Sequence, residues 1–477
     1  MTNDRSDELA QLKQQLDSTG PGMCIAKWKQ VTMHLQNGHT HSCHHPVSHH
    51  VPLEEVMANP TALHNTNFKK AQRQQMLTGQ RPRECDYCWR VEDQGNGSLS
   101  DRVYKSSESW ARPFLDTITN QAWDHDVDPS YVEVSFGNVC NFKCSYCSPH
   151  ISSKWMEEVQ QLGPYPTSSR FNNLDWIKSE NLMPIPNNAE NPYVDAFWAW
   201  WPRMYDQLMH FRITGGEPLL NKNTFRVLDH VIDNPNTNLE LSINTNMCVP
   251  RDLLDQATER FKRIIGEGKV KKLKLFTSGE AHGKAAEYIR HGMDYNQWHD
   301  NICRMLTEVP GMEFTVMSTY NILSVPSYLR FLSDMLNIRR QFRRQGEKYA
   351  PLHLDIPYLR YPQHQSIFIA SPDLLPSIES QVSYMFSNPE VPGWPPLEYH
   401  GFWPHEVEKL KRIYWVTQNE ANRTRDAAAE HKRNMHRRDF ALFVDEHDRR
   451  RGTDFAKTFP ELMDFYSLCA GNSAANA

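Results

Sequence analysis

Residues Tyr131 to His150, YVEVSFGNVCNFKCSYCSPH, combine a short apolar segment with a cysteine-rich loop. The first six residues are rich in Val, Phe and Tyr with a period of two, which predicts a β-strand. The loop that follows carries Cys140, Cys144 and Cys147 in the spacing C-x3-C-x2-C. Three thiolates can hold three irons of a cubane 4Fe–4S cluster, and no fourth cysteine lies nearby in the sequence. The fourth iron is then open to a chelating small molecule.

The cysteine triplet, with Tyr146 just before its last thiol, resembles the signature of radical S-adenosylmethionine (SAM) enzymes. In that family SAM binds the open iron through its amino and carboxylate groups, and is cleaved reductively to methionine and a 5′-deoxyadenosyl radical. The resemblance implies two cofactors, SAM and a SAM-binding 4Fe–4S cluster, and a flavodoxin or ferredoxin-type reductant. A zinc knuckle or a group of redox-sensing thiols is the alternative interpretation.

Length, charge and hydropathy limit the classes of protein to which the chain can belong. The chain has 477 residues, enough for two or three domains. Its formal net charge is −5, which gives no general attraction to nucleic acid. No apolar run approaches the length of a membrane span, and the first twenty residues are too polar for a signal peptide. A cytoplasmic location follows, and in a reducing compartment clustered cysteines indicate metal rather than disulfides.

A second set of cysteines precedes the first. Cys24, Gly38 and Cys43 follow the pattern C-x13-G-x4-C, and Cys85 and Cys88 form a C-x2-C pair. Asn37-Gly38 predicts a hairpin turn that brings Cys24 and Cys43 together, while residues 67–77 predict a basic helix. The spacing resembles the auxiliary-cluster modules called Twitch and SPASM, although these usually follow the catalytic barrel. It implies a second, auxiliary 4Fe–4S cluster, and a structural zinc ion is the alternative. Seven histidines crowd the same region: His34, His39, His41, His44, His45, His49 and His50.

The central part of the chain has a β/α rhythm. Six strands with crossover helices predict an α/β fold, a partial (β/α)6 TIM-like barrel of the radical SAM type, with its chemistry at the carboxyl ends of the strands. The six predicted strands are Tyr131–Phe136, His210–Thr214, Leu239–Ile243, Leu273–Thr277, Glu313–Ser318 and Leu352–Ile356.

Candidate cofactor-binding residues lie at these strand ends. Gly215, Gly216 and Glu217 follow the second strand, and they match the family's GGE motif, which holds the amino group of SAM. Glycine permits close approach of the backbone, and a glutamate can accept bonds from an ammonium group. Polar groups at the third strand end, Ser242 and Asn244, suit a ribose or a carboxylate. The resemblance further implies that Ser278 and Arg290 engage the SAM carboxylate.

The predicted domain organisation has five parts: a polar lead-in (1–20), the auxiliary-cluster module (21–92), a linker (93–127), the radical SAM barrel (128–377) and a mainly helical C-terminal extension (378–477). A long insertion, Gly163 to Arg203, carries the aromatic run 197–201, which either borders a substrate opening or packs on the barrel. The short basic run Lys432–Arg438 is typical of a solvated helix face.

The expected function is that of a radical SAM enzyme that abstracts hydrogen from a substrate. Twitch and SPASM relatives often modify peptides or proteins, so the resemblance implies a peptide or protein substrate. Two alternatives stay open at this point. One is radical SAM modification of RNA or a small metabolite, and the other is a non-catalytic iron–sulfur electron-transfer protein.

Overall fold

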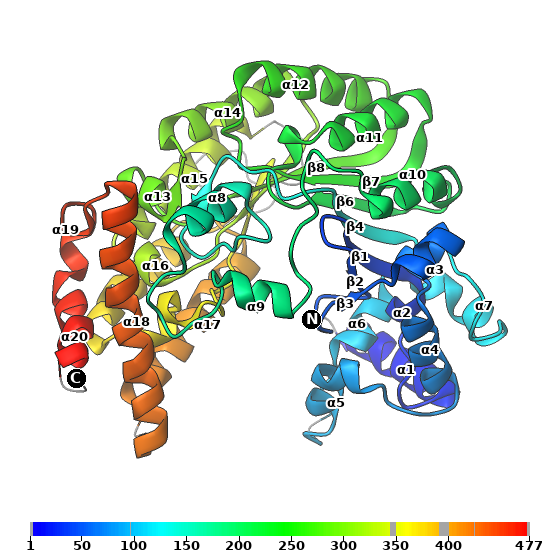
Figure 1. The fold of residues 1–477 in the computed structure, drawn as a ribbon, viewed down its shortest axis with the longest axis horizontal. Coiled ribbons are helices and arrows are strands. Elements are labelled where there is room, and N and C mark those ends of the chain that lie inside the picture. The colour runs from blue at the N-terminus through cyan, green and yellow to red at the C-terminus, as the bar shows by residue number, and fades with distance from the viewer. Residues whose placement is uncertain (1–2, 96, 344–349, 391–399, 424, 475–477) are drawn as a thin grey trace. The chain divides into compact units, whose positions relative to one another are not determined.

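The computed structural model describes residues 3–95, 97–343, 350–390, 400–423 and 425–474. It is an α/β protein built on a largely parallel sheet of nine strands, followed by a C-terminal helical region (Figure 1). No helix among the described residues is long and apolar enough to cross a membrane.

All six predicted strands are present, with shifts of at most a few residues at their ends. Alternate side chains such as Val132, Val134, Phe211 and Ile213 are fully buried, which is the period-two pattern that predicted them. The observed strands are β4 (Tyr131–Ser135), β6 (His210–Thr214), β7 (Asn236–Asn244), β8 (Val270–Ser278), β10 (Glu313–Met317) and β11 (Leu352–Asp355).

The strands follow one another in the order β11-β10-β8-β7-β6-β4-β1-β2-β3. From β4 to β11 this is the order of the chain, and the pairs β4–β6, β6–β7, β8–β10 and β10–β11 are parallel. Right-handed crossovers that all advance in one direction place their helices on one face of a sheet. A barrel requires this single direction of winding, whereas a doubly wound sheet reverses it. Closure of the sheet into a partial barrel stays a prediction.

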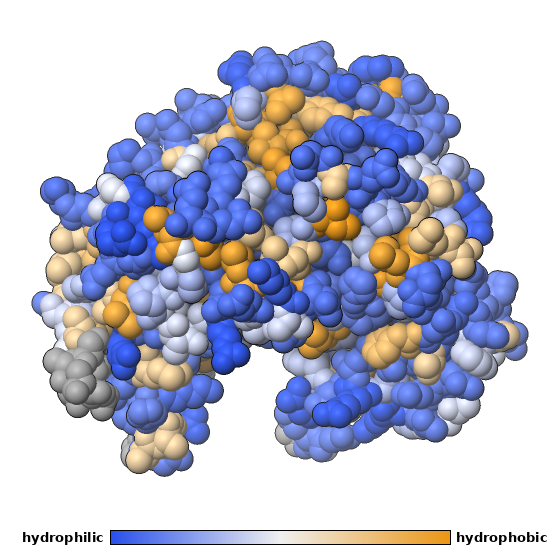
Figure 2. All heavy atoms as spheres, viewed as in Figure 1, coloured by the Kyte–Doolittle hydropathy of each residue, from blue (hydrophilic) through white to orange (hydrophobic). Residues whose placement is uncertain are grey.

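The crossover helices are amphipathic. In α12, for example, Leu254, Phe261 and Ile264 are buried, and the outer side of this helix is hydrophilic in Figure 2. The helices between β4 and β11 are α8 (Ser153–Leu162), α9 (Leu174–Ser179), α10 (Pro192–Tyr205), α11 (Lys222–Asp233), α12 (Arg251–Gly266), α13 (Lys284–Ile289), α14 (Tyr295–Glu308) and α15 (Tyr328–Phe342).

The N-terminal cysteine region adds three strands to the sheet. The hairpin predicted at Asn37-Gly38 is confirmed, because β1 (Gln30–His34) and β2 (His39–His41) pair antiparallel on either side of it. Strand β1 also pairs with β4 in parallel, and β3 (His49–His50) completes the edge. The sequence did not predict this extension, because the turn signal is local whereas the β1–β4 pairing joins segments about a hundred residues apart.

Contacts divide the chain into two compact units. The first unit comprises Met1–Asn138, Asn181–Ile243 and Gly268–Lys272, and the second comprises Val139–Glu180, Asn244–Glu267 and Leu273–Ala477. Residues of the predicted barrel, 128–377, therefore belong to both units, because the chain passes between them several times.

In the first unit, the predicted lead-in and linker are packed structure. Helix α1 (Asn3–Thr19) buries Leu9, Leu12 and Leu16, and the predicted linker buries Val103 and Trp110 in the same core. The leucines recur at helical spacing within a polar sequence, so three side chains suffice to dock the helix. The other helices of this region are α2 (Ala26–Lys29), α3 (Leu53–Ala58), α4 (Asn67–Leu77), α5 (Asp86–Glu92), α6 (Asp101–Ser107) and α7 (Leu115–Thr119).

The aromatic run of the long insertion belongs to α10, the last helix before β6. Phe197, Trp200 and Trp201 are buried, and the indole of Trp198 donates to Asn223 Oδ1 at 2.9 Å. These rings pack within the first unit, so the packing interpretation is the one that the structure supports. The helix was not predicted, because the prolines before it indicated a loop.

In the second unit, the C-terminal helices occur where the sequence predicted a helical region. Helix α18 lies beside α20 in Figure 1, and Phe440, Phe443 and Val444 on α18 are buried. Two arginines of the basic run, Arg433 and Arg437, donate to backbone carbonyls of residues 369 and 370, so this run is only partly a solvated face. The helices are α16 (Leu375–Ser387), α17 (Pro404–Asn422), α18 (Ala427–Arg451), α19 (Phe455–Thr458) and α20 (Met463–Ala474).

Candidate metal centres

The loop with Cys140, Cys144 and Cys147 belongs to the second unit and is anchored on both sides of Cys144. Its short strand β5 (Lys143–Cys144) pairs antiparallel with β9 (Arg290–His291), which places Cys144 opposite Arg290. A turn joins the amide of Cys147 to the carbonyl of Cys144 at 2.9 Å. The loop therefore has a defined backbone, which a preformed metal site requires.

Cys140, Cys144 and Cys147 are half-buried. Burial raises the pKa of Cys144, and it raises the pKa of Cys147 to about 12, with the neighbouring Cys144 adding to the effect. Thiols of this kind are protonated when free, so a metal that binds them must displace the protons. The donor set is soft sulfur, which suits iron–sulfur clusters and zinc.

A buried polar network surrounds Cys144. The guanidinium of Arg290 donates to Glu280 Oε2 at 2.6 and 3.0 Å, and its Nη1 lies 3.5 Å from Cys144 Sγ. The hydroxyl of Tyr146 donates to Glu280 Oε1 at 3.1 Å. Burial raises the pKa of Glu280, and the charge of Arg290 opposes that rise. An N–H aimed at a ligand sulfur stabilises negative charge on it, so this network can hold and tune a thiolate.

Sequence reasoning missed Glu280. It is almost fully buried two residues after β8, where polar residues of a parallel sheet commonly act, and that position is a signal that could have indicated it. The structure brings Arg290 to the cysteine loop, where its side chain contacts Glu280, Tyr146 and Cys144. Its role toward a SAM carboxylate stays a prediction.

The loop after β7 also contacts the cysteine loop within the second unit. Asn246 Nδ2 donates to Asn141 Oδ1 at 2.7 Å, and Asn141 Nδ2 donates to the carbonyl of Cys248 at 2.8 Å. The thiol of Cys248 is directed at the Asp294 carbonyl, 3.5 Å away. Cys248 is therefore a neighbour of the loop that the sequence did not reveal, and its thiol already has an acceptor.

The glycine–glutamate motif lies after β6, in the first unit. Gly215 has φ +123°, and a Cβ there would lie 2.6 Å from Ser135 Oγ, so glycine is required at this position. Gly216 N donates to the carbonyl of Gly137 at 3.2 Å. The buried carboxylate of Glu217 accepts from Leu219 N at 3.0 Å and caps the 3-10 helix Pro218–Leu220. This turn keeps the glutamate fixed.

The other predicted cofactor residues occupy the expected strand positions. Asn244 is the last residue of β7 and Ser278 the last of β8, while Ser242 lies within β7 opposite Arg212. All three are half-buried. The carboxyl-end placement is confirmed for Asn244 and Ser278, and their contacts with a cofactor stay predictions.

The second set of cysteines converges in the first unit. Cys24, Cys43, Cys85 and Cys88 line one pocket, which is partly open to solvent. Burial raises the pKa of Cys24 to about 12, and the other three thiols add to the effect. Cys24 lies just before α2, Cys43 follows β2, and the other two come from the start of α5 and the turn before it. The C-x2-C and C-x13-G-x4-C patterns thus predicted which residues meet.

The spacing of these four sulfurs bears on the metal. Among the described residues, the group of three ligand atoms that lie within 4.8 Å of one another is His44, His45 and Asp101, and no three cysteine sulfurs meet that distance. One tetrahedral zinc with bonds of about 2.3 Å holds its thiolates about 3.8 Å apart. A cubane binds each thiolate to a different iron and holds the sulfurs further apart. Four thiolates can bind either a cubane cluster or a zinc ion, so the identity of the metal stays a prediction.

Buried cations lie beside this pocket. Lys27 and Lys69 are at most 2% exposed, and Arg73 is fully buried. The ammonium of Lys27 binds the Glu84 carboxylate and contacts the Cys85 thiol, while Lys69 Nζ lies 2.7 Å from His64 Nδ1. Burial lowers the pKa of Lys69, with Arg73 and Lys27 adding to the effect, and Cys43 opposes it. Such cations favour an anionic partner, which metal-bound thiolates provide.

Of the seven histidines, His45 reaches the pocket. Its Nε2 lies 2.6 Å from Asp101 Oδ2, and its ring stacks on Tyr87. His44, which is largely exposed, lies 3.4 Å from the same carboxylate oxygen. An ordinary histidine–carboxylate pair accounts for this group.

No protein-family model matches the chain, and no curated protein matches it either.

Proposed function

We propose that this protein is a radical SAM enzyme, with a partial (β/α)6 barrel and its SAM-binding 4Fe–4S cluster on Cys140, Cys144 and Cys147. The observation that carries the proposal is the cysteine loop itself, which follows β4 and has Arg290 Nη1 3.5 Å from Cys144 Sγ. When bound, the cluster and SAM supply a 5′-deoxyadenosyl radical that removes a hydrogen atom from a substrate.

The chain's own residues bind and orient these groups. Arg290, held by Glu280, directs an N–H toward the Cys144 sulfur and offsets its negative charge. We assign Glu217 to the amino group of SAM, because its turn fixes a buried carboxylate after β6. Gly215 and Gly216 allow close backbone approach. Ser242 and Asn244 are assigned to the ribose or the carboxylate of SAM, and Ser278 with Arg290 to its carboxylate.

We infer that the N-terminal pocket holds a second, auxiliary 4Fe–4S cluster on Cys24, Cys43, Cys85 and Cys88. The proposal is supported by the four thiols that line one pocket and by the buried cations Lys27 and Lys69 beside it. Four protein ligands leave no open iron, so this centre would accept an electron or help to position the substrate.

We propose a peptide or protein as the substrate class, on the resemblance of the auxiliary module to Twitch and SPASM domains. A flavodoxin or ferredoxin-type protein would supply the electron. The net charge of −5 argues against general attraction to nucleic acid. RNA or a small metabolite is the alternative substrate.

The test is mass-spectrometric detection of 5′-deoxyadenosine after anaerobic reconstitution, reduction and addition of SAM. We expect the product from the wild type and none from Cys140→Ala, which removes one ligand of the SAM-binding cluster. Glu217→Ala should weaken SAM cleavage while both clusters still assemble. Unchanged cleavage in Glu217→Ala would remove the role assigned to that carboxylate.

An assembled cluster without product separates the alternatives. If SAM alters the electron paramagnetic resonance (EPR) signal of the reduced wild type, the enzyme needs its substrate before it cleaves SAM. If SAM leaves the signal unchanged, no open iron is present, and an electron-transfer protein is the better assignment.

A further inference from the structure

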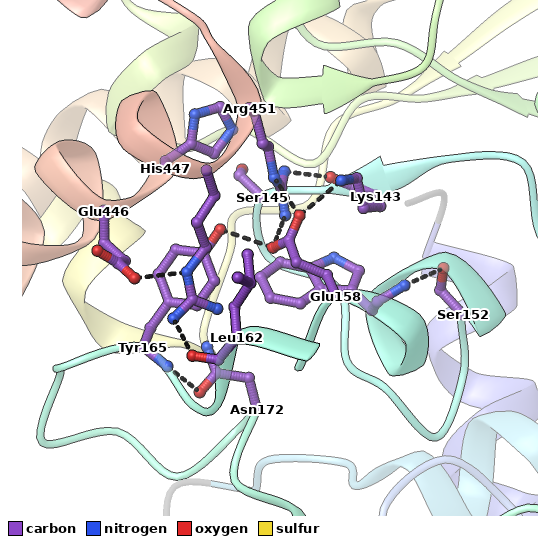
Figure 3. Close-up of polar contacts among 12 residues, drawn as sticks. Lys143, Ser145, Ser152, Glu158, Leu162, Tyr165, Asn172, Glu446, His447 and Arg451 are labelled. Carbon is purple, nitrogen blue, oxygen red and sulfur yellow. Dashed lines mark hydrogen bonds and ion pairs between the residues drawn. The ribbon is translucent and has the colours of Figure 1, made fainter. Parts of the chain in front are cut away.

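The last turn of α18 reaches the cysteine loop within the second unit. Arg451, the final residue of this helix, has a fully buried side chain. Its Nε and Nη2 donate to the two carboxylate oxygens of Glu158 at 3.2 and 3.1 Å, and its Nη1 donates to the carbonyl of Lys143 at 2.6 Å. Figure 3 shows Arg451 between Glu158 and Lys143. One guanidinium thus joins the C-terminal helix, α8 and the cysteine loop.

The carbonyl that Arg451 holds belongs to the peptide just before Cys144. The carbonyl of Cys144 itself accepts from Trp155 Nε1 at 2.7 Å. The guanidinium of Arg451 lies over that same indole, 4.6 Å from the ring centroid. The carbonyls of Lys143 and Cys144 are therefore both fixed. Arg451 binds the first directly, and the second is bound by the indole on which Arg451 packs. A backbone held on both sides sets the direction of its side chain.

Glu158, the carboxylate that binds Arg451, has further hydrogen-bond partners. Glu158 also accepts from Lys143 Nζ at 2.6 Å and from the Tyr165 hydroxyl at 2.9 Å. Burial alone would raise the pKa of Glu158, but Arg451 and Lys143 lower it to about 2. The residue before it in α18, Arg450, donates from Nη1 to the Gly163 carbonyl at 2.8 Å. The helix thus clamps α8 and the segment after it at several points.

We propose that Arg451 is a positioning residue of the SAM-binding cluster, which makes the C-terminal helix a working part of the metal centre. This inference rests on the proposed function. Arg451 touches neither SAM nor the reacting atoms, and it acts through the Lys143–Cys144 backbone and through Trp155. Its planar fork of donors makes three directed bonds, which lysine cannot reproduce.

The variants that test this role differ in what they remove. Arg451→Gln removes the fork and the charge, whereas Arg451→Lys keeps the charge. Trp155→Phe removes the N–H that reaches the Cys144 carbonyl, together with the five-membered ring that carries it, and keeps an aromatic six-membered ring. The matched control is Arg449→Gln on the same turn of α18, because Arg449 is exposed and pairs with Glu446.

The measurement is the EPR spectrum of each reduced, full-length holoprotein as SAM is titrated. Only a cluster with an open iron responds to SAM, so the SAM-dependent difference reports this centre alone. We expect Arg451→Gln and Trp155→Phe to bind SAM roughly tenfold or more weakly, the effect typical of residues that orient metal ligands. Arg451→Lys should recover part of the loss, and Arg449→Gln should match the wild type.

Folding is monitored by circular dichroism and by the iron that stays in the N-terminal centre. If Arg451→Gln fails to fold, Arg451→Lys and Trp155→Phe decide, each compared with the wild type once circular dichroism shows that it folds. If the folded variants bind SAM as tightly as the wild type, Arg451 stabilises the fold and does not position the cluster. A wild type with no SAM-dependent signal would instead overturn the proposed function, and with it this inference.

Discussion

At the scale of single residues, Lys69 is unusual because its ammonium is buried without a carboxylate among its described contacts. Its Nζ lies against His64, and Arg73 contacts the other nitrogen of the same ring. Two cations around one neutral imidazole are unfavourable in a low-dielectric environment. The nearby thiol of Cys43 interacts favourably with Lys69, and it would do so more strongly as a metal-bound thiolate.

We therefore expect Lys69→Met to weaken metal binding at the N-terminal pocket by roughly 10–100-fold, as for other residues that support metal ligands. Methionine keeps most of the volume and removes the positive charge. Metal retention in a chelator titration measures the change, and Lys70→Met on the same helix is the control, because Lys70 pairs with Asp126 instead. Equal retention in the two variants would show that the charge of Lys69 does not act on the thiols.

At the scale of elements, the β1–β2 hairpin depends on Gly38. Its φ is +68°, which favours glycine, and a Cβ would lie 2.2 Å from Cζ of the Tyr193 ring. The Tyr193 hydroxyl donates to the carbonyl of Val51 at 3.1 Å, so this ring cannot easily move away. Glycine is therefore required at this position of the C-x13-G-x4-C pattern, both by the backbone conformation of the turn and by the packing of α10 against it.

Gly38→Ala should lower the free energy of unfolding by about 1–3 kcal/mol, the usual cost of overpacking. Because the hairpin carries Cys43 toward the pocket, metal content should fall as well. Chemical denaturation followed by circular dichroism measures the stability. The control is Gly163→Ala, which also has a positive φ but has no atom near the added Cβ. A Gly38 variant no less stable than that control would mean that the hairpin and α10 separate easily.

At the scale of the whole molecule, each compact unit carries one set of cysteines. Cys24, Cys43, Cys85 and Cys88 belong to the first unit, while Cys140, Cys144 and Cys147 belong to the second. Because each unit carries its own set of cysteines, we expect the two centres to assemble independently.

Cys85→Ala combined with Cys88→Ala should lower the iron content from about eight to about four per chain, one cubane having been lost. The remaining cluster should still respond to SAM in the EPR spectrum. Elemental analysis after anaerobic reconstitution measures both iron and zinc. Loss of zinc with iron unchanged would show that the N-terminal centre is a zinc site. Loss of all iron would contradict independent assembly.

Local sequence was enough to predict most of the regular elements. Period-two patterns located six strands, and Asn37-Gly38 located the hairpin, because side-chain alternation and turn geometry depend on a few neighbouring residues. Cysteine spacing also identified the four thiols that share the N-terminal pocket. The docking of α1 was missed, although its leucines were visible in the sequence, because a polar composition hid their common face.

Tertiary structure alone decided what surrounds the thiols. Arg451 and Glu158 are 293 residues apart in the chain, and Lys143 and Arg451 are 308 apart. No periodicity or motif links such positions, because their contact exists only after α18 packs on α8. The same holds for Glu280 beside Arg290 and for the cations beside Cys43 and Cys85. Ligand types follow from local spacing, whereas burial and charge around the ligands follow from packing between distant segments.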